Sequence, residues 1–258
     1  MGNAKNQAEE FIKKYPQNFI NFQSHDRKMH LVFAGDPNKR PLLFVHGSPG
    51  SWKAWSEFLL NEKLQANFHI IAIDRPGFGG SEKGRVENSL QRQASDIVQA
   101  LQFNKSGKAA ILVGHSLGGP IIARMAMDFP QKVLGLIFVA GSVDPSQEQM
   151  KWYQYPAQSS LLRWMIPSDL LVCNDEILTL KNELKKMQPL WSKVTAKSYI
   201  IHGEKDDLVP IANVDFLLAH LEKSSVVKVI RVAEMNHFIP WKRQDLIFEA
   251  IDYFLRFQ

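Results

Sequence analysis

Several features that mark specialised classes of protein are scarce or missing in this sequence. Its 258 residues include one cysteine, Cys173, which excludes an intramolecular disulfide and a zinc site built on cysteines. No stretch reaches the roughly 18 apolar residues that a membrane span needs. The first residues also lack the apolar region of an export signal. We therefore expect a protein without a membrane span, located in the cytoplasm.

Concentrated positive charge is also lacking. The net charge of +5 comes from scattered Lys and Arg side chains, and the densest cluster is Lys181, Lys185 and Lys186. Nucleic-acid binding usually requires a basic stripe or a reading module, so no nucleic-acid partner is expected. Hydrophobic residues make up 45% of the chain and charged residues 22%, which is typical of an ordinary globular protein.

Short apolar runs recur along the chain and are rich in β-branched residues. Continuous apolar runs, rather than strict alternation, favour strands that are buried on both faces of a parallel sheet. The predicted strands are 41–47, 68–74, 109–115, 133–141, 197–203 and 226–232.

Amphipathic helical patterns separate these runs. Leu90, Ala94 and Ile97 fall on one stripe of a helix that Asn88 or Ser89 can cap, and similar stripes occur around 214–221 and 247–254. Repeated alternation of strand and helix predicts an α/β protein with a doubly wound, mostly parallel sheet.

One region interrupts the alternation. Residues 142–195 contain no convincing buried strand but several short helical patterns, so we predict a core of 1–141 and 196–258 with a small helical cap insertion at 142–195. Its large side chains either line an apolar pocket or pack the cap onto the core. They are Trp152, Tyr153, Tyr155, Leu161, Leu162, Trp164, Met165, Met187 and Trp191.

A serine lies between two glycines directly after one predicted strand. Residues 114–118 read Gly-His-Ser-Leu-Gly, and a helical pattern follows. Between a strand and a helix, G-x-S-x-G places its serine in a strained turn, and the glycines remove Cβ atoms that would clash. We predict that Ser116 is a nucleophile rather than only a polar residue in a turn.

The segment after the 41–47 strand is a candidate oxyanion hole. Attack by a serine places negative charge on a carbonyl oxygen, and each backbone N–H aimed at that oxygen is worth about 3 kcal/mol. The natural donors are the N–H groups of Ser48 and of Leu117, which follows the nucleophile. His46 precedes the turn, and we expect it to make structural hydrogen bonds.

A base and an acid for this serine are available after two later strands. A serine hydroxyl needs a base to remove its proton, and the base needs a carboxylate to orient it. His237, in the loop before the last helix, is the predicted base, and Asp206 is the predicted acid. Their order along the chain, serine then acid then histidine, is the order that this architecture requires. The alternatives to Asp206 are Asp207, Glu204 and Asp144.

Five motifs together resemble the α/β-hydrolase superfamily, and the resemblance covers nearly the whole chain. They are the loop at 46–49, the "DRPGFGGS" turn at 74–81, the elbow at 114–118, "GEKDDLVP" at 203–210 and "NHF" at 236–238. The resemblance implies Ser116 as nucleophile, Asp206 as acid, His237 as base, Ser48 and Leu117 as oxyanion donors, and a cap inserted after the 133–141 strand.

Departures from related groups narrow the expected activity. Haloalkane dehalogenases and epoxide hydrolases resemble the HG-x-P loop but use aspartate as nucleophile, where this chain has Ser116. Proline iminopeptidases carry Gly-Gly-Pro-Gly where this chain has Gly-Ser-Pro-Gly at 47–50. We predict a serine hydrolase, specifically a carboxylesterase, that cleaves a small apolar acyl or aryl ester without a metal or an organic cofactor.

Other functions remain open at this stage. The same residues could hydrolyse an amide, a lactone or a carbon–carbon bond in a diketone, and the fold could also serve a non-catalytic ligand receptor. A peptide substrate with a free amine would require a carboxylate in the cap. The candidates are Glu148, Asp169, Asp175, Glu176 and Glu183.

Overall fold

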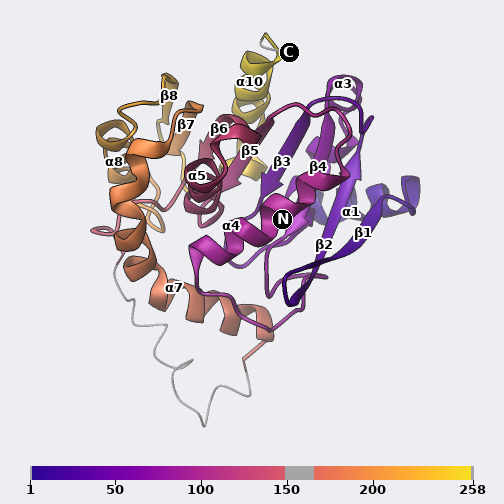
Figure 1. The fold of residues 1–258 in the computed structure, drawn as a ribbon, viewed down its shortest axis with the longest axis horizontal. Coiled ribbons are helices and arrows are strands. Elements are labelled where there is room, and N and C mark those ends of the chain that lie inside the picture. Colours follow the sequence, from indigo (N-terminus) through magenta and orange to yellow (C-terminus); the bar gives the residue numbers. More distant parts are fainter. Residues whose placement is uncertain (1, 149–165, 257–258) are drawn as a thin grey trace.

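The fold is built around a sheet of eight strands (Figure 1). A computed structural model describes residues 2–148 and 166–256. The strand order is β1-β2-β4-β3-β5-β6-β7-β8. The strands from β4 to β8 run parallel, whereas β1 and β2 pair in antiparallel fashion with each other and β2 does so with β4. The sheet is therefore the mostly parallel, doubly wound sheet that the sequence predicts.

All six predicted strands are confirmed, with ends that differ by two residues at most. The strands are β1 (Phe19–Ser24), β2 (Arg27–Ala34), β3 (Pro41–Val45), β4 (His69–Asp74), β5 (Ala110–His115), β6 (Val133–Val139), β7 (Lys197–Gly203) and β8 (Val226–Val232).

The antiparallel hairpin of β1 and β2 was not predicted. A two-residue turn at His25 and Asp26 joins the strands, and His25 has a φ of 53°. In β2 the buried Met29 and Leu31 alternate with the exposed Lys28 and the half-buried His30. This alternation is the signal that could have identified the hairpin, since one face of an edge hairpin lies toward solvent.

Helices cover both faces of the sheet (Figure 1). One apolar cluster packs α4, α5 and α8 on one face, and a second packs α1, α2 and α10 on the other. The helices are α1 (Gly2–Lys14), α2 (Ser56–Leu60), α3 (Glu62–Asn67), α4 (Leu90–Val98), α5 (Gly118–Asp128), α7 (Ser168–Met187), α8 (Ala212–His220), α9 (Ile239–Lys242) and α10 (Gln244–Leu255), with 3-10 turns at Trp52–Trp55, Gln99–Phe103, Pro130–Lys132 and Gln188–Lys193. None of those within 2–148 and 166–256 has both the length and the apolar character needed to cross a membrane.

Successive side chains of the central strands enter opposite layers of the core. In β3, Leu43 and Val45 belong to the cluster under α4 and α5, while Leu42 and Phe44 belong to the cluster under α2 and α10. This explains why the sequence shows continuous apolar runs, because both faces of these strands are buried.

The expectation that β8 is buried on both faces is wrong. Only Val232 of this strand is buried, and Lys228 and Arg231 are exposed. The reason is its position, because β8 ends the sheet and pairs only with β7.

Between β6 and β7 the described residues form helices rather than strands. Instead of several short helices, 168–187 form the single 20-residue helix α7. Met187 and Trp191 are buried among core side chains, so these two pack against the core. The other large side chains considered for the pocket, from Trp152 to Met165, lie outside the described residues.

Candidate active site

The candidate site lies at the carboxyl edge of the sheet, where parallel strands present the residues that follow them. Ser48 follows β3, Ser116 follows β5, Asp206 follows β7 and His237 follows β8. Arg75, which the sequence did not single out, follows β4. The strand order places β4, β3 and β5 side by side, so the loops that carry Arg75, Ser48 and Ser116 lie close together.

Ser116 occupies a strained turn between β5 and α5. Its φ of 54° is in the left-handed region, which is uncommon for a residue with a Cβ atom. The turn is held by hydrogen bonds from Ser116 N to Val139 O (3.0 Å) and from Gly119 N to Ser116 O (2.9 Å). The serine side chain is partly exposed while the residues around it are buried, which is the arrangement expected of a nucleophile elbow.

Two glycines allow neighbouring chain segments to approach the serine. A Cβ atom at Gly118 would lie 2.4 Å from Val45 O, and one at Gly47 would lie 2.9 Å from Ser116 Cβ. Both distances are too short for real contacts, so the loop after β3 packs against Ser116 only because Gly47 has no side chain.

His237 and Asp206 form a buried pair. His237 Nδ1 lies 2.7 Å from Asp206 Oδ2, and both residues are less than 10% exposed. Asp206 Oδ1 accepts further hydrogen bonds from the backbone N–H groups of Leu208 (3.0 Å) and Val209 (2.8 Å). Because a carboxylate can only accept, His237 Nδ1 carries the hydrogen, which leaves Nε2 able to take a proton.

The alternative acids do not occupy this position. Asp207 and Glu204 are exposed. Asp144 Oδ1 accepts a hydrogen bond from Ser146 N at 2.8 Å. Asp206 is therefore the carboxylate that contacts the His237 ring.

His115 links the serine turn to the histidine loop. His115 Nε2 lies 3.1 Å from His237 O, and the two rings are 4.7 Å apart between centroids. Burial, together with the nearby His237, lowers the pKa of His115 well below its ordinary value, so the ring is neutral and donates from Nε2. Among the described residues no hydrogen bond joins the Ser116 and His237 side chains, and such contacts often tighten only when substrate binds.

His202 contacts both Asp206 and the loop that carries it. Its Nε2 lies 2.9 Å from Val209 O and 3.6 Å from Asp206 Oδ2. Since Val209 N donates to the same carboxylate, His202 holds the loop that orients Asp206. Burial lowers the pKa of His202, which keeps the ring neutral near pH 7.

The Gly47–Ser48 peptide has a fixed orientation. Arg75 N donates to His46 Nε2 at 2.9 Å, so His46 Nδ1 carries the hydrogen and donates to Gly47 O at 2.7 Å. Arg75 Nη2 donates to the same carbonyl at 3.1 Å. In a trans peptide the N–H points away from the carbonyl, so Ser48 N–H is directed away from Arg75. His46 thus makes the structural hydrogen bonds expected of it.

The two N–H groups predicted to form the oxyanion hole are available. Within the described part of the chain, neither Ser48 N–H nor Leu117 N–H donates to a backbone carbonyl. Leu117 also precedes the first residue of α5, where the positive end of the helix dipole favours negative charge.

Buried polar side chains form a hydrogen-bond network with Ser48. The sequence did not indicate that these side chains contact one another. Arg75 donates to Glu176 through Nη1 (2.7 Å) and Nη2 (3.0 Å), and Glu176 Oε2 accepts from Ser48 Oγ (2.6 Å). Gln93 Nε2 donates to Glu176 Oε1 at 2.9 Å. Glu176 belongs to α7, about 100 residues from Arg75 in the chain, so no local pattern could reveal the pairing.

The single cysteine also reaches this region. Burial raises the pKa of the Cys173 thiol, although a hydrogen bond with the Ser48 side chain opposes the rise. Cys173 lies one turn before Glu176 on α7. Nothing in the local sequence around Cys173 indicates that it lies beside the loop at Ser48.

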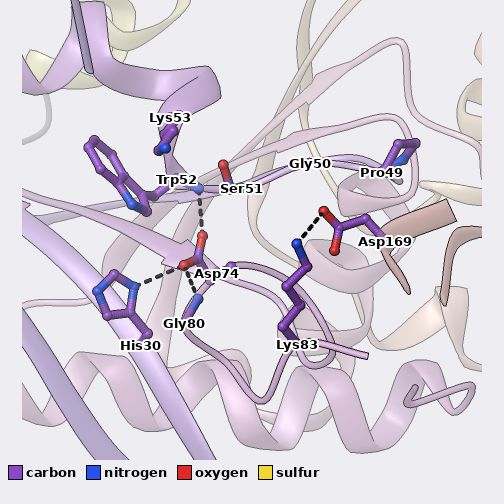
Figure 2. Close-up of a pocket in the computed structure, with 11 residues that line it drawn as sticks. His30, Pro49, Gly50, Ser51, Trp52, Lys53, Asp74, Gly80, Lys83 and Asp169 are labelled. Atoms are coloured by element: carbon purple, nitrogen blue, oxygen red, sulfur yellow. Dashed lines mark hydrogen bonds and ion pairs between the residues drawn. The ribbon is translucent and has the colours of Figure 1, made fainter. Parts of the chain in front are cut away.

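A cavity lies beside the same loop (Figure 2). This cavity has a volume of about 600 Å³, and Pro49, Gly50, Asp74, Lys83 and Asp169 contribute to its lining. Figure 2 shows the Asp74 carboxylate directed toward His30, Trp52 and Gly80. Asp74 Oδ1 accepts from Trp52 N at 2.8 Å, so Asp74 fixes the segment that follows the loop.

The parts of the chain described, 2–148 and 166–256, contain no group of three or more His, Cys, Asp or Glu side chains arranged to hold a metal ion.

The neutral state of His46 gives a prediction for stability. Burial, and then the charge of Arg75, lowers the pKa of His46 from 6.5 to about 3. Between these values the unfolded chain binds the proton and the folded chain does not. The free energy of unfolding should therefore fall as the pH is lowered from 6.5 toward 3, by up to about 1.4 kcal/mol per pH unit from this residue.

His46→Gln should flatten this dependence, because glutamine can accept from Arg75 N but does not titrate. Urea unfolding of both proteins between pH 7 and about pH 4.5 measures the difference in slope. The wild-type slope also contains contributions from other buried histidines, so only the difference between the two proteins counts. Identical slopes would contradict the assignment.

A family model described as the alpha/beta hydrolase fold matches residues 40–164. Epoxide hydrolase 3 of Xenopus tropicalis is 26% identical over 177 residues, which cover 67% of this chain and 46% of that protein. The chain spans less than half the length of curated relatives such as this one and other epoxide hydrolases.

Solved structures match over more of the chain. A membrane phospholipase A, described as a bacterial virulence factor, has a TM-score of 0.71 at 18% identity, covering 98% of this chain and 92% of that one. Est816, described as an enzyme that degrades N-acyl homoserine lactones, has a TM-score of 0.68 at 19% identity, covering 91% and 100%. The chain has the α/β-hydrolase fold.

Proposed function

We propose that the protein is a serine hydrolase that cleaves carboxylic esters of small apolar acyl or aryl molecules. The observation that carries the proposal is the buried His237–Asp206 pair at 2.7 Å, on the same edge of the sheet as a serine in a left-handed turn. An imidazole oriented by a carboxylate is the group that activates a serine hydroxyl for attack on a carbonyl carbon.

In the first half of the proposed reaction, Ser116 Oγ attacks the carbonyl carbon while His237 Nε2 takes the hydroxyl proton. The negative charge passes to the carbonyl oxygen, which the N–H groups of Ser48 and Leu117 stabilise. The bond to the leaving oxygen then breaks, and His237 returns the proton to that oxygen. The products are a free alcohol and an acyl group on Ser116.

The second half regenerates the serine. Water attacks the acyl carbon while His237 Nε2 takes its proton, and the bond to Ser116 Oγ breaks as His237 returns the proton to that oxygen. Asp206 orients the ring in both halves and stabilises its charged form. The acid is released, and each half of the reaction leaves His237 neutral again.

The serine at position 116 supports a substrate with a carbonyl group rather than an epoxide. Attack by serine on an epoxide carbon would form an ether, which water does not cleave at this site. Attack on an ester carbonyl forms an acyl-enzyme, which water does cleave. The proposal therefore differs from the activity named for the epoxide hydrolases that the chain resembles in sequence.

The contacts of the carboxylates that could bind a substrate amine support an ester substrate rather than a peptide with a free amino group. Four of them already bind other groups: Glu176 binds Arg75, Glu183 accepts from Leu90 N at 3.1 Å, Asp169 pairs with Lys83 at 3.3 Å, and Glu148 accepts from Ser142 Oγ. A substrate ammonium group would compete with these partners at the four carboxylates.

We also propose that residues 142–195 form a cap over the site and that the remainder forms the core. Helix α7 supports this arrangement, because it carries Glu176 and Cys173 to the loop at Ser48. A cap in this place would set which acyl or aryl groups reach Ser116.

Covalent labelling with a small alkyl phosphonate tests the proposed function. The phosphonate mimics the tetrahedral intermediate, so an activated serine should be labelled once per chain, on Ser116, as seen by intact mass and peptide mapping. Folded protein that carries no adduct, or an adduct at another residue, would overturn the proposal and favour a non-catalytic receptor.

A substrate comparison separates the remaining hydrolases. An ester series of increasing chain length is set against amino-acid arylamides and simple lactones, with kcat/KM measured for each. We expect the esters to give the highest values. Preference for arylamides would favour a peptidase on the same residues, and preference for lactones a lactonase.

A further inference from the structure

Two ion pairs join helix α7 to the segment that follows β4. Lys83 and Asp169 pair at 3.3 Å with side chains 56% and 41% exposed, at the rim of the cavity in Figure 2. Arg75 and Glu176 pair at 2.7 Å with side chains 0% and 2% exposed. One helix thus makes a surface contact and a buried contact with the same segment.

Stability alone does not account for the buried pair, because moving two charges out of water often costs more than their attraction returns. Nε of Arg75 is also buried without a partner among the described residues. Apolar side chains of similar volume would serve packing at least as well. This points to a role for the charges themselves.

The ion pair contacts both sides of the Gly47–Ser48 peptide. Glu176 Oε2 accepts from Ser48 Oγ at 2.6 Å, and Arg75 Nη2, 3.0 Å from the same oxygen, donates to Gly47 O at 3.1 Å. The carbonyl before the peptide nitrogen and the side chain after it are therefore tied to one buried carboxylate.

We propose that Glu176 is a positioning residue, which holds the Gly47–Ser48 peptide so that Ser48 N–H points into the oxyanion hole. The proposal rests on the proposed function, since the direction of this N–H matters only if charge develops on a substrate carbonyl oxygen. Glu176 would also couple the cap to catalysis, because it lies on α7 while the peptide belongs to the core.

The loop has a second, independent anchor. Asp74 holds Trp52 N at 2.8 Å on the cavity side of the loop (Figure 2). Gly47 O also keeps its hydrogen bond from His46 Nδ1, so loss of Glu176 should loosen Ser48 without detaching the rest of the loop. This limits the expected effect to the direction of the Ser48 N–H.

The experiment compares Glu176→Gln and Ser48→Ala with Asp169→Asn. Glu176→Gln removes the charge, and Ser48→Ala removes only the hydroxyl that Glu176 holds while keeping the backbone N–H. Asp169→Asn is the matched control, because it breaks the exposed ion pair of the same helix. For each full-length protein, ester kcat and KM, the rate of phosphonate labelling, and deuterium uptake of residues 42–55 are measured.

We expect kcat and the labelling rate to fall about tenfold in Glu176→Gln and Ser48→Ala, with KM changed by less than about twofold, because an oxyanion contact acts mainly in the transition state. Deuterium uptake at 42–55 should rise. Asp169→Asn should match the wild type in all of these. Ser48→Ala leaves no buried charge unpaired, so it decides the question if Glu176→Gln does not fold.

Wild-type values of kcat and uptake in the folded variants would overturn the positioning role. A fall in thermal stability with unchanged kcat would do the same, since it would show a merely structural contact. If the wild type itself is not labelled by the phosphonate, the proposed function fails. Deuterium uptake at 42–55 then decides alone whether Glu176 holds the loop.

Discussion

Ser116→Ala should lower ester kcat by at least about 10⁴-fold, because no other group can form the acyl intermediate. The rate that remains would come from the oxyanion donors and from substrate binding, which do not need the hydroxyl. The measurement is kcat on the best ester of the chain-length series. Phosphonate labelling of the same preparation checks that the remaining rate does not come from a contaminating serine hydrolase.

The fold provides the control for this variant. Alanine keeps a Cβ atom at position 116, so the packing of Gly47 against it is unchanged. The unfolding midpoint should therefore stay within a few degrees of the wild type. A folded variant that retains more than a small fraction of the activity would mean that a different residue is the nucleophile.

Asp206→Asn should lower kcat by about 10⁴-fold, the loss expected when the acid of a serine triad becomes an amide. Asparagine can still accept from Leu208 N and Val209 N, so the loop should keep its shape. Its amide nitrogen, however, would donate toward His237 Nδ1. The ring would then hold its hydrogen on Nε2 and could not take the proton of Ser116.

Asp207→Asn is the matched control, because Asp207 is adjacent in the chain and exposed. It should retain wild-type kcat and KM. The two variants are compared on one ester at several pH values, since a changed tautomer lowers the rate at every pH. If Asp207→Asn were the damaging change, the acid would be assigned to the wrong residue.

The strands, and the order of the candidate residues along the chain, could be predicted because both depend on local patterns. A strand buried on both faces reads as a continuous apolar run, as in β5, and its carboxyl end marks where Ser116 must lie. The hairpin of β1 and β2 was not predicted, because its apolar residues alternate with polar ones and do not form the continuous run of a strand that is buried on both faces.

The contacts behind the site could not be predicted, because they depend on how distant segments approach. Glu176 was one of five candidate carboxylates for binding a substrate amine, and nothing in the sequence of α7 indicates that this one meets Arg75. The same limit applied to the acid: Asp206 and Asp207 are adjacent, and only the direction of each side chain distinguishes them. Local sequence therefore indicates the strands and the residues at their ends, but not which side chains of distant segments come into contact.

The left-handed turn at Ser116 has a consequence for how this chain would change under selection. A residue with a Cβ atom costs about 1 kcal/mol more than glycine in that conformation. Screening random variants for heat resistance alone should therefore enrich glycine at position 116. Such proteins would be more durable and inert, so the serine can persist only in lineages where turnover itself is selected.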